Sequence, residues 1–186
     1  MKNEFDAHRV NGEQHPLQKQ YGLKARPALH EKLDVGRANF DGVEYLHEPT
    51  GMLVSGAIDD LWIDEGGQYI VVDYKATAKS EPVTELNDQW HEGYKRQMEV
   101  YQWLLRHNGL EVSDTGYFVY CTGRPDEKAF DAKISFDVHL IAYTGNDGWV
   151  EGVLTKIKKT LDSKKIPSAA KDCDYCAYRH AIHELE

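Results

Sequence analysis

Apolar residues gather in short runs over the first half of the chain, and the spacing of these runs predicts a segment rich in strands. Runs of strand length occur at 43–47, 52–63 and 69–73. Residues 64–67, Asp-Glu-Gly-Gly, separate the last two runs and tolerate the positive φ angles of a tight turn. We therefore predict a β-hairpin of 52–63 and 69–73, which the run at 43–47 extends into a three-stranded meander.

The apolar period lengthens to three and four residues after residue 89, which predicts an amphipathic helix. The residues that follow this spacing are Trp90, Tyr94, Gln97, Met98, Tyr101, Leu104 and Leu105. The pair Asn108 and Gly109 is a suitable C-terminal cap for this helix. A second helix of the same kind is predicted over 149–161.

Further strands and helices complete the expected order. The runs at 115–122 and 133–143 predict two more strands. Residues 1–12 resemble the end of a helix that lacks an N-terminal cap, as if the chain were entered midway, and residues 13–24 are polar. A proline at its first position predicts a short helix over 27–33. This order of elements favours an α/β fold in which helices cover a mixed sheet.

The whole chain fits one domain, 1–186, with a helical N-terminal part (1–42), a core (43–161) and a C-terminal tail (162–186). Its 186 residues are enough for one buried core, and 41% hydrophobic with 28% charged residues is ordinary for a globular protein. No apolar run reaches the roughly 18 residues that a membrane span needs. We therefore expect no membrane partner.

Cysteine content and charge indicate the cellular compartment and the kind of partner to expect. Three cysteines, an odd number, argue against a disulfide framework and for a reducing compartment. The first residues resemble neither a signal peptide nor a transit peptide, so we expect a cytoplasmic protein. The net charge of −9 argues against a general nucleic-acid coat but leaves room for a local basic track.

Charged residues follow directly after the apolar run at 69–73. Asp73 and Lys75 stand two residues apart on a strand, so their side chains share a face. Asp59, on the partner strand, can lie across the hairpin from them. Two carboxylates that remain charged form a hard-oxygen site suited to Mg²⁺ or Mn²⁺. Such an ion polarises a phosphodiester and activates a water, and a lysine can stabilise the charge on phosphorus. The alternative is an ordinary salt bridge at the end of a strand.

Gln97 and Tyr101 are four residues apart on the apolar face of the predicted helix. A tyrosine is common on such a face, but a buried glutamine must find partners for its amide. If this helix packs beside the end of the hairpin, both side chains border the carboxylates and can contact a phosphate or orient a water.

These motifs together resemble the PD-(D/E)XK nuclease superfamily. The pattern is Gly56-x-x-Asp59, then Asp73-Tyr74-Lys75 after an apolar strand, then Gln97-x-x-x-Tyr101 on the next helix. More narrowly, the chain is similar to the RecB-like branch, which includes the CRISPR-associated RecB-type exonucleases. The resemblance covers roughly residues 51–105 and implies a restriction-endonuclease-like fold, with a mixed central β-sheet flanked by α-helices.

The resemblance also implies roles for individual residues. Asp59 and Asp73 would ligate Mg²⁺ or Mn²⁺, with the backbone carbonyl of Tyr74 as a further ligand. Lys75 would be the catalytic lysine, and the accessory pair would be Gln97 and Tyr101.

Two positions complicate this assignment. Asp60 competes with Asp59, but the Gly-x-x-Asp register favours Asp59, and a strand would place the two side chains on opposite faces. The branch usually takes another metal ligand from an upstream helix. Here His8 is the nearest candidate, and His30 and Glu44 fit less well.

The C-terminal tail carries Cys173-x-x-Cys176, which resembles the cysteine pair that closes an iron–sulfur cluster in some RecB-like nucleases. Such a cluster needs four ligands, and Cys121 is the one other cysteine, so we do not expect a cluster in this chain. A zinc site is one alternative, with His180 and His183 added to the two cysteines. Two free thiols near a short helix are the other.

A local basic track is the expected contact with nucleic acid. Lys79, Lys95 and Arg96 flank the proposed site, and Lys156 and Lys159 lie on the later helix. They can neutralise backbone phosphates without reading sequence, although exposed lysines of this kind are usually only solvated. Base stacking and core packing are the two alternatives for the tryptophans Trp62, Trp90 and Trp103.

Two functions therefore follow from the sequence. The first is a metal-dependent nuclease that hydrolyses DNA phosphodiester bonds, in the manner of an exonuclease that acts on ends or single strands. Its branch commonly works with a helicase or another protein partner. The second is a non-catalytic protein that keeps the nuclease fold to bind nucleic acid or a partner. The complete Asp/Asp/Lys set favours the first function, and the unassigned upstream ligand favours the second.

Overall fold

The computed structural model describes residues 1–125, 129 and 131–184. The end of the predicted tail, residues 185 and 186, lies outside them. The chain divides into two compact units, Met1–Val150 and Glu151–Glu186.

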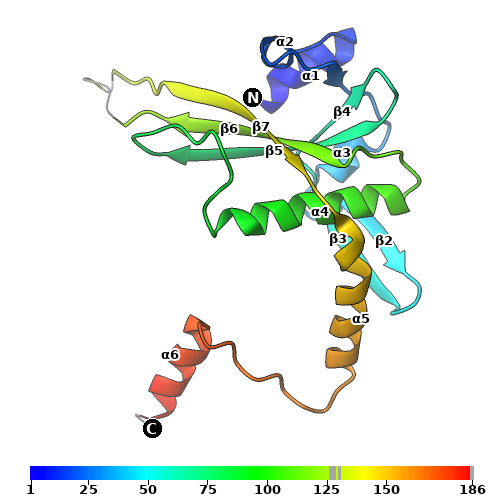
Figure 1. Cartoon of the computed structure of the whole chain (residues 1–186), viewed down its shortest axis with the longest axis vertical. Coiled ribbons are helices and arrows are strands. Elements are labelled where there is room, and N and C mark those ends of the chain that lie inside the picture. Colours follow the sequence, from blue (N-terminus) through cyan, green and yellow to red (C-terminus); the bar gives the residue numbers. More distant parts are fainter. Residues whose placement is uncertain (126–128, 130, 185–186) are drawn as a thin grey trace. The chain divides into compact units, whose positions relative to one another are not determined.

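A five-stranded mixed sheet forms the centre of the first unit (Figure 1). Its strands, in spatial order, are β1 (Ala25–Pro27), β4 (Asp60–Asp64), β5 (Tyr69–Ala78), β6 (Thr115–Gly123) and β7 (Phe136–Thr144). Strands β5 and β6 are parallel, and the other neighbours are antiparallel. The predicted strands at 69–73, 115–122 and 133–143 correspond to β5, β6 and β7, although β5 continues to Ala78 and β7 begins only at Phe136. Helices flank it on both faces, so the predicted α/β class is confirmed.

The predicted long strand over 52–63 is wrong, and so is the meander. Its two ends form separate strands, β3 (Met52–Gly56) and β4, which belong to different sheets. Strand β3 pairs with β2 (Val43–His47) in a small two-stranded sheet. The chain leaves β3 at Gly56, which packs closely against helix α4 (His91–His107): a Cβ there would lie 2.8 Å from Cε1 of Tyr101. The residues between the strands place Asp59 directly before β4, opposite Asp73 of β5.

Helix α4 (His91–His107) covers one face of the main sheet (Figure 1). It confirms the predicted helix after residue 89, and Asn108 is its C-cap, followed by Gly109 at φ 84°. Met98 and Leu104 are fully buried on this face, and Met98 packs closely against Gly116 of β6.

The opposite face is covered by α1 (Lys2–Asn11) and α2 (Pro16–Gln20) (Figure 1). Phe5 of α1 stacks on Trp62 of β4, with ring centroids 5.4 Å apart, and Val72 and Val119 belong to the same core cluster. Helix α1 confirms the prediction for residues 1–12. The polar segment at 13–24 contains α2, which begins with a histidine cap, because Nδ1 of His15 accepts a hydrogen bond from the Leu17 N–H.

The helix predicted over 27–33 is wrong. Pro27 ends strand β1, and the short helix α3 begins later (Leu33–Gly36). Pairing between β1 and β4 holds this segment extended, and the N–H of Ala28 continues the pairing with a hydrogen bond to the Leu61 carbonyl. Tertiary pairing therefore overrides the local preference of proline for a helix start.

The second unit contains helix α5 (Val150–Leu161) from its second residue onward, a connecting segment and helix α6 (Asp174–His183). A short 3₁₀ turn, Asp147–Trp149, precedes α5, so the helix predicted over 149–161 is confirmed with its first residue in that turn. Among the described residues, no helix is both long enough and apolar enough to cross a membrane.

Candidate active site

Of the two aspartates of the predicted site, Asp73 lies within β5 and Asp59 directly precedes the neighbouring strand β4. Asp60 pairs with Val72 in the antiparallel register, so the preceding Asp59 is opposite Asp73. Oδ2 of Asp59 accepts a hydrogen bond of 2.9 Å from the Tyr74 N–H. Asp73 is 3% exposed, whereas the side chain of Asp59 is 28% exposed. One carboxylate is therefore buried, and the other lies at the opening.

The pKa of Asp73 is raised to about 6. Burial is the largest cause, the nearby Lys75 opposes it, and the negative charge of Asp59 adds to it. Nζ of Lys75 lies 2.6 Å from Oδ2 of Asp73. The ammonium group of Lys75 therefore offsets only part of the effect of burial on this carboxylate.

Lys75 is held from three sides. Its Nζ atom pairs with Asp73, donates a 3.0 Å hydrogen bond to Oε1 of Gln97, and lies 4.3 Å from the ring centroid of Tyr94. Tyr94 was placed on the apolar stripe of α4 by its spacing but was not predicted as a site residue. Its position three residues before Gln97, on the same helix face, is the signal that could have found it.

Gln97 and Tyr101 extend this chain of contacts along α4. Nε2 of Gln97 donates a 2.8 Å hydrogen bond to the Tyr101 hydroxyl oxygen, so both ends of the amide have partners. Burial raises the pKa of Tyr101. The helix predicted to border the carboxylates thus lies beside Lys75, and Gln97 fixes the position of its ammonium group.

Asp60 belongs to a different network from Asp59. It is fully buried and pairs with the guanidinium groups of Arg9 and Arg37, the latter at 2.6 Å. The hydroxyl of Tyr74 donates a further 2.6 Å hydrogen bond to its Oδ2 atom. These partners occupy the Asp60 carboxylate within the fold and leave Asp59 as the aspartate beside Asp73.

Helix α1 brings Lys2, and not His8, to the aspartates. Nζ of Lys2 lies 2.8 Å from Oδ1 of Asp59. His8 lies instead beside His15, with ring centroids 5.0 Å apart, and 3.8 Å from Oε2 of Glu13. Sequence analysis did not single out Lys2, because a lysine at the start of a helix is usually solvated.

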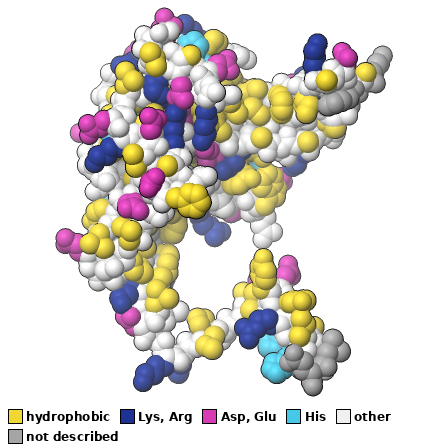
Figure 2. All heavy atoms as spheres, turned by 180° about the vertical axis from the view of Figure 1, so that it is seen from behind, with side chains coloured by type: hydrophobic (Ala, Val, Ile, Leu, Met, Phe, Trp, Pro, Cys, Tyr) yellow, Lys and Arg dark blue, Asp and Glu magenta, His cyan; other side chains and the backbone are white. Residues whose placement is uncertain are grey.

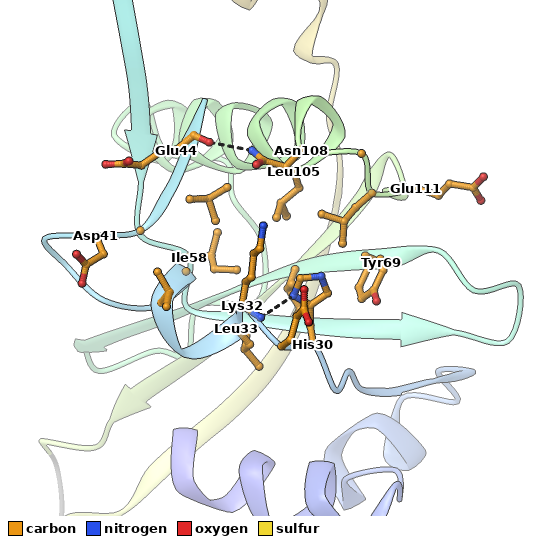
Figure 3. A pocket seen from close by; sticks show the side chains of 18 of the residues that line it. His30, Lys32, Leu33, Asp41, Glu44, Ile58, Tyr69, Leu105, Asn108 and Glu111 are labelled. Atoms are coloured by element: carbon orange, nitrogen blue, oxygen red, sulfur yellow. Dashed lines mark hydrogen bonds between the residues drawn. The ribbon is translucent and has the colours of Figure 1, made fainter. Parts of the chain in front are cut away.

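The weaker upstream candidates, His30 and Glu44, line a pocket of about 730 Å³. Figure 3 shows this pocket between the α3 segment, the start of β2 and the C-terminal end of α4. Its described lining includes neither Asp59 nor Asp73.

The donor set fits a hard divalent cation. Asp59 and Asp73 supply carboxylate oxygens, which are hard ligands, and Asp73 is almost fully buried. Within the described residues, no group of three or more histidine, cysteine, aspartate or glutamate side chains is arranged to hold a metal. Mg²⁺ commonly binds through one or two carboxylates and keeps several waters, so two aspartates suit it without a third side chain.

Two of the three basic residues predicted to flank the site have local partners. Nζ of Lys79 lies 5.1 Å from the Trp90 ring centroid and 3.7 Å from Asp88, and Lys95 pairs with Glu92 at 2.7 Å. Arg96 is exposed. On the face shown in Figure 2, basic and acidic side chains are interspersed over the surface.

Two of the three tryptophans proposed as base-stacking residues belong to the core. Trp62 is fully buried and Trp103 is 2% exposed, whereas Trp90 is 45% exposed. Lys156 and Lys159 are exposed on α5, in the second unit.

The cysteine pair caps helix α6. Sγ of Cys173 accepts a 3.4 Å hydrogen bond from the Cys176 N–H, and both thiols are free. The proposed zinc set with His180 and His183 is not assembled, since the described residues contain no three-ligand group. Cys121 is buried in β6.

Comparison with known proteins identifies the family to which this site belongs. The family model of the PD-(D/E)XK nuclease superfamily matches residues 5–181. The comparisons with curated proteins and with solved structures gave no match. The five-stranded mixed sheet, the Asp/Asp/Lys cluster on β5 and beside the start of β4, and the extent of this match agree, and we conclude that the chain belongs to the PD-(D/E)XK nuclease superfamily.

Proposed function

We propose that this protein is a Mg²⁺- or Mn²⁺-dependent nuclease of the RecB-like branch, which cleaves DNA at ends or in single strands. The observation that carries this proposal is the convergence of Asp59, Asp73 and Lys75 where β4 begins beside β5, with Lys75 held by Gln97 and Tyr94. A lone surface salt bridge needs none of these extra contacts.

Asp59, Asp73 and the Tyr74 carbonyl would hold the divalent cation. When bound, this cation supplies a Lewis acid that polarises the phosphodiester and lowers the pKa of a water. Asp73 fixes the buried side of the site, and Asp59 faces the side from which substrate enters.

Lys75 provides a fixed positive charge beside the reacting phosphate. Its ammonium group is oriented before substrate binds by Asp73, Gln97 and the Tyr94 ring, so little reorganisation is needed as negative charge grows on phosphorus. Tyr101 supports this arrangement through Gln97. The accessory pair therefore acts by positioning Lys75.

Lys79, Lys95 and Arg96 would neutralise phosphates of the DNA backbone, with Lys156 and Lys159 on α5 as further phosphate contacts. Trp90 offers a half-exposed ring on which a base of a single strand can stack. A helicase or another protein partner would deliver such a strand.

A non-catalytic nucleic-acid-binding role is the second candidate function. The observation that favours it is the ion pair of Asp59 with Lys2, together with the lack of a third metal-ligating side chain among the described residues.

Cleavage of end-labelled DNA distinguishes the two functions. Single- and double-stranded DNA, with RNA for comparison, would be incubated with Mg²⁺ or Mn²⁺, with EDTA as the blank. We expect metal-dependent cleavage of DNA that falls by at least about 100-fold in Lys75→Ala and Asp73→Ala. Lys158→Ala, which removes an exposed lysine paired with Asp162, should cleave like wild type. The product ladder separates exonuclease from endonuclease action.

Equal cleavage by wild type and Lys75→Ala would contradict this mechanism. DNA binding without cleavage in either metal would support the non-catalytic function.

A further inference from the structure

Helix α1 is fastened to the start of β4 by side chains on one of its faces. Asp6 pairs with Arg37 at 2.9 Å, and Arg9 pairs with Asp60 and donates a 3.1 Å hydrogen bond to the Leu61 carbonyl. Residues separated by three or four positions share a helix face, so these contacts also set the direction of Lys2. The register of α1 therefore carries the Lys2 side chain toward Asp59.

Lys2 pairs with one carboxylate oxygen of Asp59, and the backbone of Tyr74 binds the other. Nζ of Lys2 lies 2.8 Å from Oδ1, while Oδ2 accepts the Tyr74 N–H. Lys75 pairs in the same way with Asp73. Each carboxylate thus has one ammonium group, and the formal charges of the four side chains cancel.

We propose that Lys2 is a built-in competitor of the divalent cation at Asp59, and that its displacement sets the metal affinity of the site. The proposal rests on the proposed function, because it assigns the cation to the same two aspartates. A divalent ion at Asp59 would lie close to the Lys2 ammonium, and two cations on one carboxylate oxygen repel each other. The Lys2 side chain is 44% exposed, so its ammonium can move into water.

This role differs from that of an ordinary stabilising ion pair. Exposed pairs contribute little to folding, so removal of Lys2 should leave the melting temperature almost unchanged. Metal binding should respond strongly, since the substitution removes a positive charge from the immediate surroundings of the cation.

Mn²⁺ binding to the EDTA-stripped full chain tests the proposal directly. The dissociation constant would be measured at low salt from the electron paramagnetic resonance signal of free Mn²⁺. Lys2→Met should lower it by about 3- to 10-fold, and the gain should shrink as salt screens the repulsion. Lys2→Arg, which keeps the charge, should bind like wild type. Lys24→Met is the matched control, because it removes the same charge from an exposed pair with Glu65.

Amine labelling gives a second readout that does not depend on the variants. The rate at which an acetylating reagent modifies Lys2 would be followed by mass spectrometry with and without Mg²⁺. We expect the cation to raise this rate several-fold by freeing the amine, and to leave the rate at Lys24 unchanged.

Each failure has a distinct signature. If wild type binds Mn²⁺ but Lys2→Met binds it no more tightly than Lys24→Met, or if Mg²⁺ leaves Lys2 labelling unchanged, the competition is disproved while the proposed nuclease function stands. If wild type and every Lys2 variant bind no Mn²⁺, both proposals fail.

Discussion

The fold buries the Asp73 carboxylate, and burial destabilises its charged form. Its pKa is raised to about 6, chiefly by burial, so the folded state binds a proton that the unfolded state has already released. Protonation of Asp73 therefore stabilises the folded state fully below the unfolded pKa of 3.8, and this stabilisation is lost as the pH rises through about 6. A divalent cation would offset this cost at neutral pH.

The Asp73→Asn variant should reveal this cost. A pKa that rises from 3.8 to about 6 corresponds to roughly 3 kcal/mol. As the pH rises from about 4 to about 7.5, the unfolding free energy of wild type should therefore fall relative to that of the variant by about 2–3 kcal/mol. Urea unfolding in EDTA measures it. Asp41→Asn, at an exposed aspartate, should track wild type across this range. A parallel course for Asp73→Asn would contradict the assigned burial cost.

Asp59 and Asp60 are adjacent, yet we expect opposite consequences when each is replaced by asparagine. Asp60→Asn leaves two largely buried guanidinium groups, Arg9 and Arg37, without their carboxylate, so it should cost about 3–5 kcal/mol of unfolding free energy. Asp59→Asn loses a partly exposed pair with Lys2 and should cost less than about 1 kcal/mol.

Chemical unfolding of both variants in EDTA, followed by the DNA cleavage assay, checks this contrast. Asp59→Asn should remain folded and lose metal-dependent cleavage. Similar losses of stability in the two variants would show that the neighbouring aspartates are not separated into a binding site and a structural network.

At the scale of residues, the sequence predicted the charged groups of the site better than the residues that hold these groups in position. The carboxylate and lysine positions followed from strand alternation and motif spacing, and the structure brings Asp59, Asp73 and Lys75 together. Lys2 and Tyr94 could not be found in this way, because their roles depend on how α1 and α4 pack against the sheet. His8 followed from helix position alone, without knowledge of which face of α1 meets β4.

At the scale of elements, strong local periodicity was sufficient to predict helices and strands, but it did not reveal which strands pair with one another. Helix α4 and strands β5 and β6 were predicted from their apolar spacing. The break between β3 and β4 was missed, because apolar residues run across it and only the packing of Gly56 against Tyr101 shows why the chain turns. The helix expected after Pro27 was missed because β1 pairs with β4.

Gly56, the last residue of β3, packs against helix α4 and should not tolerate a side chain. A Cβ at this position would lie 2.8 Å from the Tyr101 ring, so Gly56→Ala must shift α4 or the strand. We expect a loss of about 1–3 kcal/mol of unfolding free energy and a clear loss of cleavage, because Tyr101 supports Gln97 and Lys75.

Gly93→Ala is the matched control on the same helix. A Cβ there meets no atom within 4 Å, and alanine favours a helix over glycine by roughly 0.5–1 kcal/mol. Thermal unfolding should therefore show a higher melting temperature for Gly93→Ala and a lower one for Gly56→Ala. If Gly56→Ala were as stable and active as wild type, close packing at this position would not govern the site.

At the scale of the whole molecule, the net charge of −9 opposes DNA binding, and local cations must overcome it. Of the three proposed phosphate contacts, Lys79, Lys95 and Arg96, the first two already pair with Asp88 and Glu92. We therefore expect weak binding with a shallow dependence on salt. For a single strand, three neutralised phosphates correspond to a slope of log affinity against log salt of about −2.

Fluorescence anisotropy with labelled single-stranded DNA in EDTA measures this slope without cleavage. Replacement of Lys79, Lys95 and Arg96 together by glutamine should bring the slope close to zero, since each lost phosphate contact removes about 0.7 from its magnitude. Lys24→Gln, a control away from the basic track, should leave the slope unchanged. Replacement of Lys156 and Lys159 tests α5 separately. A slope lost only in that last variant would move the DNA track from the edge of the active site to the second unit, because the salt dependence follows the residues that contact phosphate.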